Sequence, residues 1–404
     1  SDIILDAVFG TGKSRGISGL FQQVLDRVGR RTRRGKQLVV ALDLPSGLDA
    51  DTGAIDPVTP AADVTITLGF PKHGLFRFPG AEKVGKLLLA DIGIPSDLAR
   101  DIRVELITEE WLGSVLPQRP LSANKGTFGK VLVIAGSINY IGAAYLACMG
   151  AARVGAGLVT LATARSLQPV LATRLVETTY LPLPETEPGI IGPEAVGAVE
   201  SSISDYEALL IGCGLGRHPK TLEFLDSVLN VMTGMKKIAL VLDADALNLL
   251  SLHTRWWHRL PYDCVLTPHP GEMARLAGTK VEDIQRDRLK VAQEMAGYWS
   301  KTVVLKGAFT VVAAPDGHAR VSGSANPGLA SAGTGDVLAG AIAGLAAQGL
   351  PLFDAAACGV ALHAMAGEMV REQLGDAGML AGDLLPALPK VIRALRLKGG
   401  VRLR

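Results

Sequence analysis

A glycine-rich stretch near the C-terminus combines residue types that bind and transfer phosphate. It reads Asn326-Pro327-Gly328-Leu329-Ala330-Ser331-Ala332-Gly333-Thr334-Gly335-Asp336 and continues into a segment of small residues, 337–345. Gly333 and Gly335 let the backbone approach an anion, and Thr334 can cap a helix whose N-terminus presents free N–H groups. Asp336 adds a carboxylate beside this anion site, which suits a general base or a ligand of metal-bound water. The competing interpretation is a capped, buried helix with an acidic first turn.

Four other segments place polar residues directly after apolar runs that we expect to be strands. The runs are 208–211, 239–242, 265–266 and 302–305, separated by helical segments. They are followed by Gly212-Cys213-Gly214-Leu215-Gly216, Asp243-Ala244-Asp245, Thr267-Pro268-His269-Pro270-Gly271-Glu272 and Lys306-Gly307-Ala308-Phe309-Thr310. Strands alternating with helices form a mostly parallel sheet that binds ligands at the carboxyl ends of its strands. We therefore expect all four segments to line one edge of the sheet.

Each of these segments also has a purely structural interpretation. Residues 212–216 suit a tight connection, Asp243 suits a helix cap, and Asp245 suits a surface charge. Glu272 is favoured in the first turn of a helix, and Lys306-Gly307 suits a hairpin corner. No spacing of His, Cys, Asp and Glu indicates a metal cluster, so any metal is expected to be Mg²⁺ that arrives with nucleotide phosphates.

Length, charge and cysteine usage limit the classes of function. A chain of 404 residues is expected to form two domains, and its net charge of +2 predicts no recruitment of nucleic acid or membrane. The four cysteines are far apart, which predicts reduced, mostly buried thiols in a cytoplasmic protein. No segment has the length of a membrane span or the pattern of a signal peptide. The chain opens inside an expected strand without Met, which predicts that sequence is missing in front of it.

The first part of the chain has the order strand, glycine loop, helix that binds phosphate in α/β proteins. Strands are expected at 3–5, 38–42, 64–68 and 84–89, with a helix at 17–28. The loop Gly10-Thr11-Gly12-Lys13-Ser14-Arg15-Gly16 is too compressed for a P-loop and suits a phosphate loop or a tight turn. Asp43 and Ser46 follow the second strand, where ligands meet a parallel sheet.

Three motifs in this part resemble the later portion of the epimerase domain of the NAD(P)H-hydrate repair enzymes. They are Asp6-Ala7-Val8-Phe9-Gly10-Thr11-Gly12, Asp43-Leu44-Pro45-Ser46-Gly47-Leu48-Asp49 and Gly69-Phe70-Pro71-Lys72. The resemblance implies a partial Rossmann-like α/β domain over residues 1–105. It implies that 10–16 bind the phosphates of the hydrate, that Asp43 binds substrate, and that Asp6 and Ser46 bind K⁺. The family's domain begins earlier, with an Asn-containing motif that is absent here, so the epimerase is expected to be incomplete.

The remaining chain, 106–404, resembles the NAD(P)H-hydrate dehydratases, whose domain is ribokinase-like with a mostly parallel sheet covered by helices. The resemblance rests on Asn124-Lys125-Gly126, residues 243–248, 267–272, 306–307, 326–336 and Met379-Leu380-Ala381-Gly382-Asp383. It implies ADP- or ATP-dependent dehydration of NADHX or NADPHX, with Asp336 as base and the amides of Gly333, Thr334 and Gly335 stabilising the phosphoryl group. It assigns Lys306, Gly307, Ala308, Phe309, Thr310 and Gly335 to the nucleotide, and Ala143, Gly214, Gly216, His269 and Asp336 to the hydrate.

Two other functions stay open at this point. A vitamin-type small-molecule kinase of the ribokinase-like class shares the Gly-Thr-Gly-Asp motif, and a non-catalytic nucleotide-binding protein is suggested by the incomplete first domain. The sequence leaves the choice between ADP and ATP, and between NADHX and NADPHX, undecided. A homo-oligomer is expected, because the small-residue helices at 337–345 and 355–365 can pack closely within or between subunits.

Overall fold

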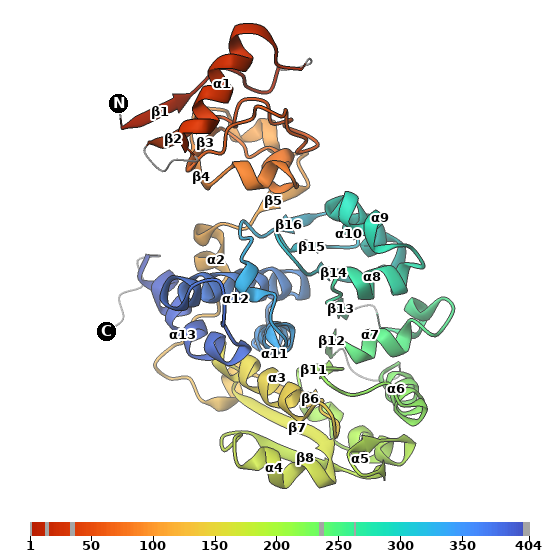
Figure 1. The fold of residues 1–404 in the computed structure, drawn as a ribbon. Helices are drawn as coiled ribbons and strands as arrows, with labels where there is room; N and C mark the ends of the chain where they lie inside the picture. Colours follow the sequence, from red (N-terminus) through yellow and green to blue (C-terminus); the bar gives the residue numbers. More distant parts are fainter. Residues whose placement is uncertain (1, 13–15, 33–36, 234–237, 262–263, 399–404) are drawn as a thin grey trace. The chain divides into compact units, whose positions relative to one another are not determined.

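The chain folds into two compact units, Ser1–Ile102 and Arg103–Arg404 (Figure 1). The computed structural model describes residues 2–12, 16–32, 37–233, 238–261 and 264–398. Each unit contains its own sheet and its own hydrophobic clusters. The expected domain boundary after residue 105 falls inside the short strand β5 (Val104–Leu106), which pairs with the sheet of the second unit.

The first unit is built on a four-stranded parallel sheet in the order β1-β2-β3-β4. Its elements are β1 (Ile3–Asp6), α1 (Gly19–Thr32), β2 (Leu38–Leu42), β3 (Val64–Leu68) and β4 (Lys86–Ala90). All four expected strands are therefore present, and so is the helix after the glycine loop. Because parallel strands end at the same edge of a sheet, Asp6 and Asp43 come to lie near one another.

The second unit is built on a ten-stranded sheet in the order β5-β16-β15-β14-β13-β12-β11-β6-β7-β8. The strands from β14 to β8 run parallel, whereas β15 is antiparallel to both of its neighbours. Their bounds are β6 (Lys130–Ile134), β7 (Leu158–Ala164), β8 (Thr179–Leu183), β11 (Ala208–Ile211), β12 (Ala239–Leu242), β13 (Cys264–Leu266), β14 (Thr302–Leu305), β15 (Val311–Ala313) and β16 (Ala319–Val321). A separate hairpin pairs β9 (Glu185–Glu187) with β10 (Ile190–Ile191).

Helices cover both faces of the larger sheet, as expected for alternating strands and helices (Figure 1). One face carries α2 (Glu109–Val115), α3 (Ile141–Arg153), α11 (Thr334–Ala347), α12 (Leu352–Leu374) and α13 (Ala381–Lys398). The other carries α5 (Val196–Glu200), α6 (Pro219–Met232), α7 (Asp245–Leu250), α8 (Pro270–Ala277), α9 (Val281–Arg286) and α10 (Arg288–Trp299), and α4 (Gln168–Ala172) follows β7. The strands expected at 208–211, 239–242, 265–266 and 302–305 are confirmed as β11, β12, β13 and β14.

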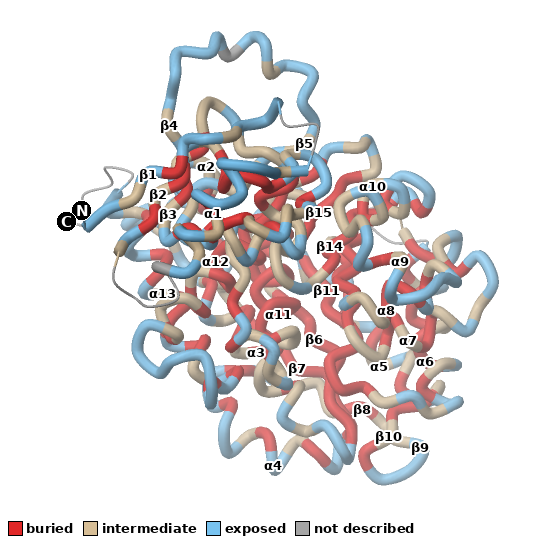
Figure 2. The backbone as a smooth tube through the Cα atoms, turned by 45° about the horizontal axis from the view of Figure 1, so that its top comes forward, coloured by how far each residue is buried: buried red, intermediate tan, exposed pale blue. Residues whose placement is uncertain are grey.

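Helix α11 is buried along almost its whole length and forms the centre of the second unit (Figure 2). Its small residues allow close contact with α3, because a side chain added at Gly340 would overlap the carbonyl group of Ala147. In return, a side chain at Gly150 of α3 would overlap the carbonyl group of Val337. The small residues of α11 and α3 therefore pack against each other within the second unit. The expected homo-oligomer stays a prediction.

The structure adds one strand that the sequence patterns did not predict and bears out two expectations. The added strand is β5, which is short enough to escape a pattern search. Lys306 and Gly307 do begin a hairpin loop, since β14 and β15 pair antiparallel. All four cysteines are buried free thiols. Among the described residues, no helix combines the length and apolar character needed to cross a membrane.

Candidate active site

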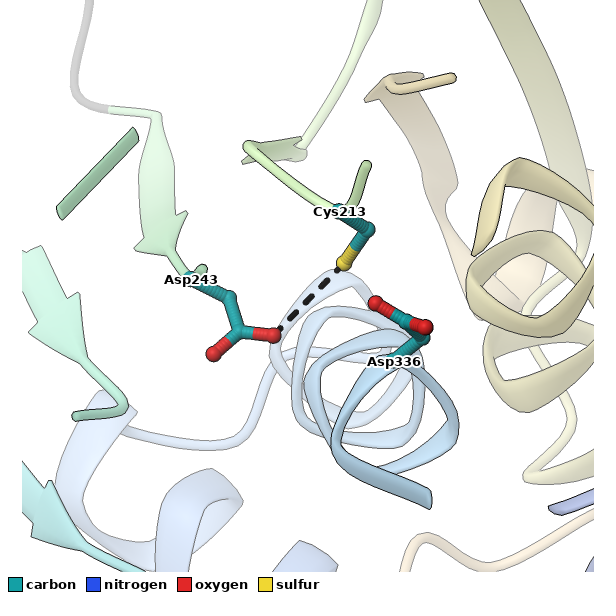
Figure 3. A group of neighbouring side chains, drawn as sticks. All are labelled: Cys213, Asp243 and Asp336. Carbon is teal, nitrogen blue, oxygen red and sulfur yellow. Dashed lines mark hydrogen bonds between the residues drawn. The ribbon is translucent and has the colours of Figure 1, made fainter. Parts of the chain in front are cut away.

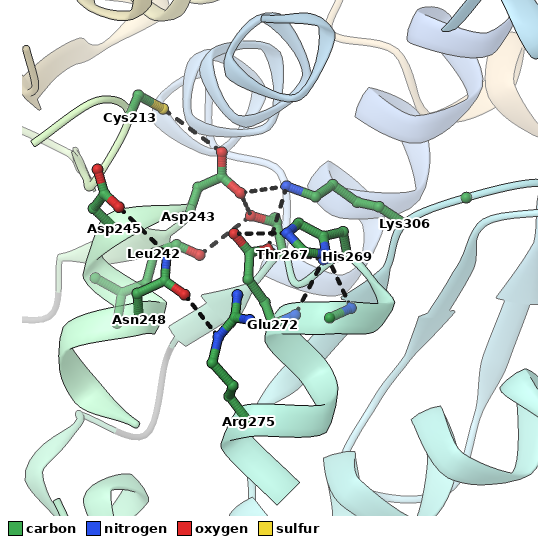
Figure 4. A network of polar contacts seen from close by, with 12 residues as sticks. Cys213, Leu242, Asp243, Asp245, Asn248, Thr267, His269, Glu272, Arg275 and Lys306 are labelled. Carbon is green, nitrogen blue, oxygen red and sulfur yellow. Dashed lines mark hydrogen bonds and ion pairs between the residues drawn. The ribbon is translucent and has the colours of Figure 1, made fainter. Parts of the chain in front are cut away.

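Asp243 lies at the centre of a buried polar network at the end of β12 (Figure 4). Its side chain is 1% exposed, and its Oδ1 accepts hydrogen bonds of 2.6 Å from both Lys306 Nζ and Thr267 Oγ1. These donors come from the ends of β14 and β13, so three neighbouring strands converge as expected. The alternative role of Asp243 as a helix cap is wrong, because its carboxylate pairs with these side chains and α7 begins without a side-chain cap.

Asp336 and Cys213 lie on the other side of Asp243 (Figure 3). The Cys213 thiol donates to Asp243 Oδ2 over 3.7 Å, and one potential ligand atom from each of the three residues lies within 4.8 Å of the others. Burial and the nearby Asp243 carboxylate raise the pKa of Asp336 to about 7. Burial also raises the pKa of Cys213, so its thiol keeps the proton that it donates to Asp243. We therefore interpret this set as a proton-handling group.

The first turn of α11 presents open amides beside Asp336. Gly333 is the N-cap with φ +89°, a left-handed conformation that suits glycine. Within the described chain, the backbone N–H groups of Gly333 and Gly335 donate to no protein acceptor. The expectation that Thr334 caps the helix is wrong, because its hydroxyl donates to the carbonyl groups of Leu329 (2.9 Å) and Ser331 (3.0 Å). Thr334 instead ties the loop to the helix, leaving the amides available to an anion.

His363 supports this turn from α12. Its Nε2 lies 2.9 Å from the carbonyl oxygen of Thr334, and burial lowers its pKa to about 4. The imidazole is therefore neutral at pH 7 and donates its Nε2–H to Thr334. Sequence reasoning missed this role, because the contact joins two helices and His363 carries no local motif.

The segment Lys306–Thr310 forms the hairpin loop between β14 and β15. The Thr310 hydroxyl donates to the Gly307 carbonyl over 2.8 Å, which closes the loop on itself. Arg288 of α10 holds the start of the loop by donating to the carbonyl groups of Leu305 (2.9 Å) and Lys306 (3.0 Å). A Cβ placed on Gly335 would lie 3.3 Å from Lys306 Nζ, so this loop reaches the first turn of α11.

His269 and Glu272 begin α8 and reach the network through Lys306. Their side chains form a capping box: His269 Nδ1 accepts from the Gly271 amide over 3.0 Å, and Glu272 Oε2 accepts from the His269 amide over 2.9 Å. Burial raises the pKa of Glu272 to about 7, and burial together with Lys306 lowers the pKa of His269. The structural interpretation of Glu272 as a first-turn residue is thus confirmed, and His269 keeps a half-exposed ring beside the network.

The glycine loop after β11 packs against the start of α3. A Cβ on Gly214 would lie 2.7 Å from the Cβ atoms of Ala143 and Tyr140, so a larger residue cannot replace this glycine without displacing them. The Gly216 amide donates to Asp245 Oδ2 over 2.9 Å. Asp245 is 14% exposed at its side chain, so its interpretation as a surface charge is wrong. Its carboxylate fixes the end of the loop.

A second group of candidates lies in the first unit. Asp6 and Ser46 are buried together, and the Ser46 hydroxyl and amide donate to the two Asp6 carboxylate oxygens over 2.6 and 2.8 Å. Asp43 adopts the left-handed conformation (φ 72°) and pairs with Lys72. Gly10 lies beside Asp43, since a Cβ on Gly10 would be 3.9 Å from Asp43 Oδ2. Lys13, Ser14 and Arg15 of the expected phosphate loop lie outside the described residues.

Comparison with known sequences finds a family match in each of the two units. The NAD(P)H-hydrate dehydratase family matches residues 131–390, and the family described as YjeF-related protein N-terminus matches residues 1–74. A bifunctional NAD(P)H-hydrate repair enzyme from Moorella thermoacetica is 43% identical over 98% of this chain and 73% of its own length. The corresponding Escherichia coli enzyme is 34% identical over 97% of this chain and 72% of its own length.

Solved structures agree with this placement. The ADP/ATP-dependent NAD(P)H-hydrate dehydratase of Bacillus subtilis, co-crystallised with ATP and Mg²⁺, superposes with a TM-score of 0.61 at 32% identity. The match covers 73% of this chain and 99% of that one. A ribokinase-like superfamily protein from Enterococcus faecalis gives a TM-score of 0.63 at 28% identity, over 73% of this chain and 97% of its own. The expected ribokinase-like α/β fold of the second unit is confirmed.

Proposed function

The chain belongs to the bifunctional NAD(P)H-hydrate repair enzymes, and we propose that its second unit dehydrates NADHX or NADPHX at Asp336, with ADP or ATP as phosphoryl donor. One observation carries the assignment of the site. The buried Asp336 carboxylate, the open amides at the start of α11 and the Lys306 hairpin loop lie together at one edge of the sheet.

The reaction needs a phosphoryl donor because hydroxide is a poor leaving group. Asp336 takes the proton of the ring hydroxyl, whose oxygen attacks the terminal phosphoryl group, and AMP leaves from ADP or ADP leaves from ATP. The lone pair of the ring nitrogen then expels phosphate. Loss of a proton from the neighbouring ring carbon restores the double bond of NADH or NADPH. A phosphoryl-transfer site is in this way used for an elimination.

The protonation behaviour of Asp336 supports its role as the base. A general base works best when its pKa lies near the working pH, and burial with the neighbouring Asp243 brings the pKa of Asp336 to about 7. The Cys213 thiol and the Lys306 ammonium beside it favour the ionised carboxylate. Asp336 is thereby ionised often enough to accept a proton and basic enough to remove one.

The amides of Gly333 and Gly335 are proposed to stabilise the transferred phosphoryl group, whereas the Thr334 amide, which was expected to join them, donates to the Ser331 carbonyl over 3.4 Å. Open amides at a helix N-terminus suit a developing negative charge. The hairpin loop Lys306–Thr310 is proposed to hold the nucleotide, with Gly335 facing its phosphates. Mg²⁺ would accompany those phosphates and neutralise charge on them. Burial alone would lower the pKa of Lys306, but Asp243 and Glu272 raise it, so Lys306 carries a full positive charge.

The hydrate is proposed to lie on the opposite side of Asp336 from the nucleotide. Gly214 packs closely against the Cβ atom of Ala143, and Gly216 continues this surface of small residues, which is proposed to face the hydrate. His269 contributes a half-exposed ring whose Nδ1 accepts from the Gly271 amide and whose Nε2 lies 3.4 Å from Glu272 Oε1, so the exposed part of the ring is proposed to contact the substrate.

The first unit is proposed to contribute the epimerase side of repair, which interconverts the R and S hydrates. Asp43 and the loop 10–16 are its candidate hydrate contacts. The buried Asp6 carboxylate pairs with no described cation, which fits a site for K⁺ completed by Ser46. K⁺ would supply positive charge there. The buried free thiols and the nicotinamide substrates favour a cytoplasmic location.

The test is to incubate the chain with hydrated NADH, Mg²⁺ and either ADP or ATP. Recovery of the absorbance of the reduced ring, with one phosphate released for each NADH formed, is the expected result. No recovery with either nucleotide would contradict the assignment. A stable phosphorylated product without recovered absorbance would identify a small-molecule kinase instead.

A further inference from the structure

A pocket opens beside the glycine loop, next to the network around Asp336. It encloses about 390 Å³, which is near the lower end of the range for small-molecule sites. The loop before α3 supplies Ile138 and Tyr140 to its lining, and the loop after β11 supplies Gly216 and Arg217. A pocket of this size takes part of a dinucleotide, and the rest of the molecule must extend beyond it.

The wall of the pocket that precedes α3 is apolar and accessible. Ile138 and Tyr140 are 50% and 54% exposed, although both are large side chains. Ser137 lies buried at the base of the same loop, beside Gly216. An aromatic ring and an aliphatic side chain in a concave site suit the base or sugar of a nucleotide.

Arg217 supplies a positive charge to the opposite wall. Its Nε lies 3.4 Å from Asp245 Oδ1, and its side chain is 65% exposed. The Asp245 carboxylate is already engaged by the Gly216 amide and by Asn248. Among the described residues, the terminal nitrogens of Arg217 donate to no acceptor. The guanidinium group is therefore available to bind a phosphate.

The glycine loop joins this pocket to the reaction centre. Cys213, near the start of this loop, belongs to the cluster with Asp243 and Asp336, and Gly216, at its end, lines the pocket. Arg217 follows Cys213 by four residues, which span at most about 14 Å of chain, so a molecule that reacts at Asp336 needs to extend only about that far to reach Arg217. We propose that the pocket holds the distal, phosphate-bearing half of the hydrated dinucleotide, with Arg217 binding one of its phosphates. The inference rests on the proposed function, because it takes the hydrate as the molecule that reacts at Asp336.

The experiment measures kcat and KM of the full chain and of Arg217→Ala with both NADHX and NADPHX, at saturating ADP. Loss of a charge-assisted hydrogen bond should raise KM about tenfold while kcat changes little. An equal rise for both hydrates identifies the pyrophosphate as the group bound, and a rise for NADPHX alone identifies the 2′-phosphate. Lys220→Ala is the matched control, because this nearby cation pairs with Glu223 on α6 and does not line the pocket.

The possible results separate this inference from the proposed function. If the unmodified chain and Lys220→Ala turn over both hydrates, and Arg217→Ala does so with unchanged KM for each, the pocket does not hold the distal half and the proposed function stands. A fall in kcat at unchanged KM would also contradict a binding role for Arg217. An unmodified chain that converts neither hydrate, with ADP or with ATP, would overturn both proposals.

Discussion

The side chains around Asp336 show how a carboxylate can be both buried and reactive. Burial and the charge of Asp243 disfavour the ionised form of Asp336, whereas the Cys213 thiol and Lys306 favour it, so these opposing effects leave the pKa of Asp336 at about 7. Lys306 is itself held by Asp243 over 2.6 Å, which keeps its charge from fully stabilising Asp336. The proton affinity of the proposed base is thus set by the ends of three strands and one helix.

This arrangement predicts how activity depends on pH. Because Asp336 must be ionised to accept a proton, kcat/KM should fall about tenfold for each pH unit well below 7. Asp243→Asn removes the like charge and frees Lys306, and both effects lower the pKa of Asp336. The acid limb of the profile should therefore move to lower pH in this variant, whatever its maximal rate. The measurement is the pH profile of kcat/KM for both proteins.

Glu272 provides the control for that profile, because burial also raises its pKa to about 7. Glu272→Gln should retain the acid limb if the limb belongs to Asp336. Disappearance of the limb in Glu272→Gln would assign it to Glu272 and remove the support for Asp336 as the titrating base.

At the scale of elements, the site depends on how closely α11 can approach its neighbours. The helix carries Asp336 in its first turn, and its glycines allow contact with the backbone of α3. His363 of α12 fixes the same turn from another direction. The packing of small residues along α11 therefore determines where the open amides point.

Replacing one of these glycines should destabilise the fold. Gly340→Ala places a Cβ against the Ala147 carbonyl, and the overlap should lower the free energy of unfolding by roughly 1–3 kcal/mol. Gly142→Ala in α3 is the control, because a Cβ there meets nothing within 4 Å. It should be neutral or stabilise by up to about 1 kcal/mol, since alanine favours helix over glycine. Urea unfolding measures both changes, and equal effects would refute the packing argument.

The sequence predicts the strands and the site edge well because both follow from local patterns. Buried runs such as 239–242 end in polar residues, and parallel sheets gather such ends at one edge. Other features depend on contacts between distant elements. The bond from His363 to Thr334 joins two helices, and the engagement of Asp245 by Gly216 depends on a loop conformation. β5 is a three-residue strand, too short for its pattern to stand out.

At the scale of the whole molecule, two units with separate cores are combined in one chain. The proposed nucleotide loop and Asp336 belong to the second unit, and the Asp6–Ser46 pair belongs to the first. The chain thus combines matches to two families, the YjeF-related N-terminus and the NAD(P)H-hydrate dehydratase, on two separate sheets.

This organisation predicts two unfolding transitions with different ligand responses. ADP with Mg²⁺ at 100 times its dissociation constant should stabilise the second unit by about 2.7 kcal/mol, since a ligand stabilises the state that binds it. The transition of the first unit should not move. Thermal unfolding followed with and without nucleotide tests this, and a single transition that moves as a whole would contradict it.

The central claim is that Asp336 is the base in nucleotide-dependent dehydration. The most direct measurement compares single-turnover conversion of NADHX to NADH, with ADP and Mg²⁺, by the unmodified chain and by Asp336→Asn. The exposed Asp316→Asn serves as an equivalent change away from the site. The account predicts a loss of about 100- to 10,000-fold for Asp336→Asn and none for Asp316→Asn. Full turnover by a folded Asp336→Asn protein would contradict it.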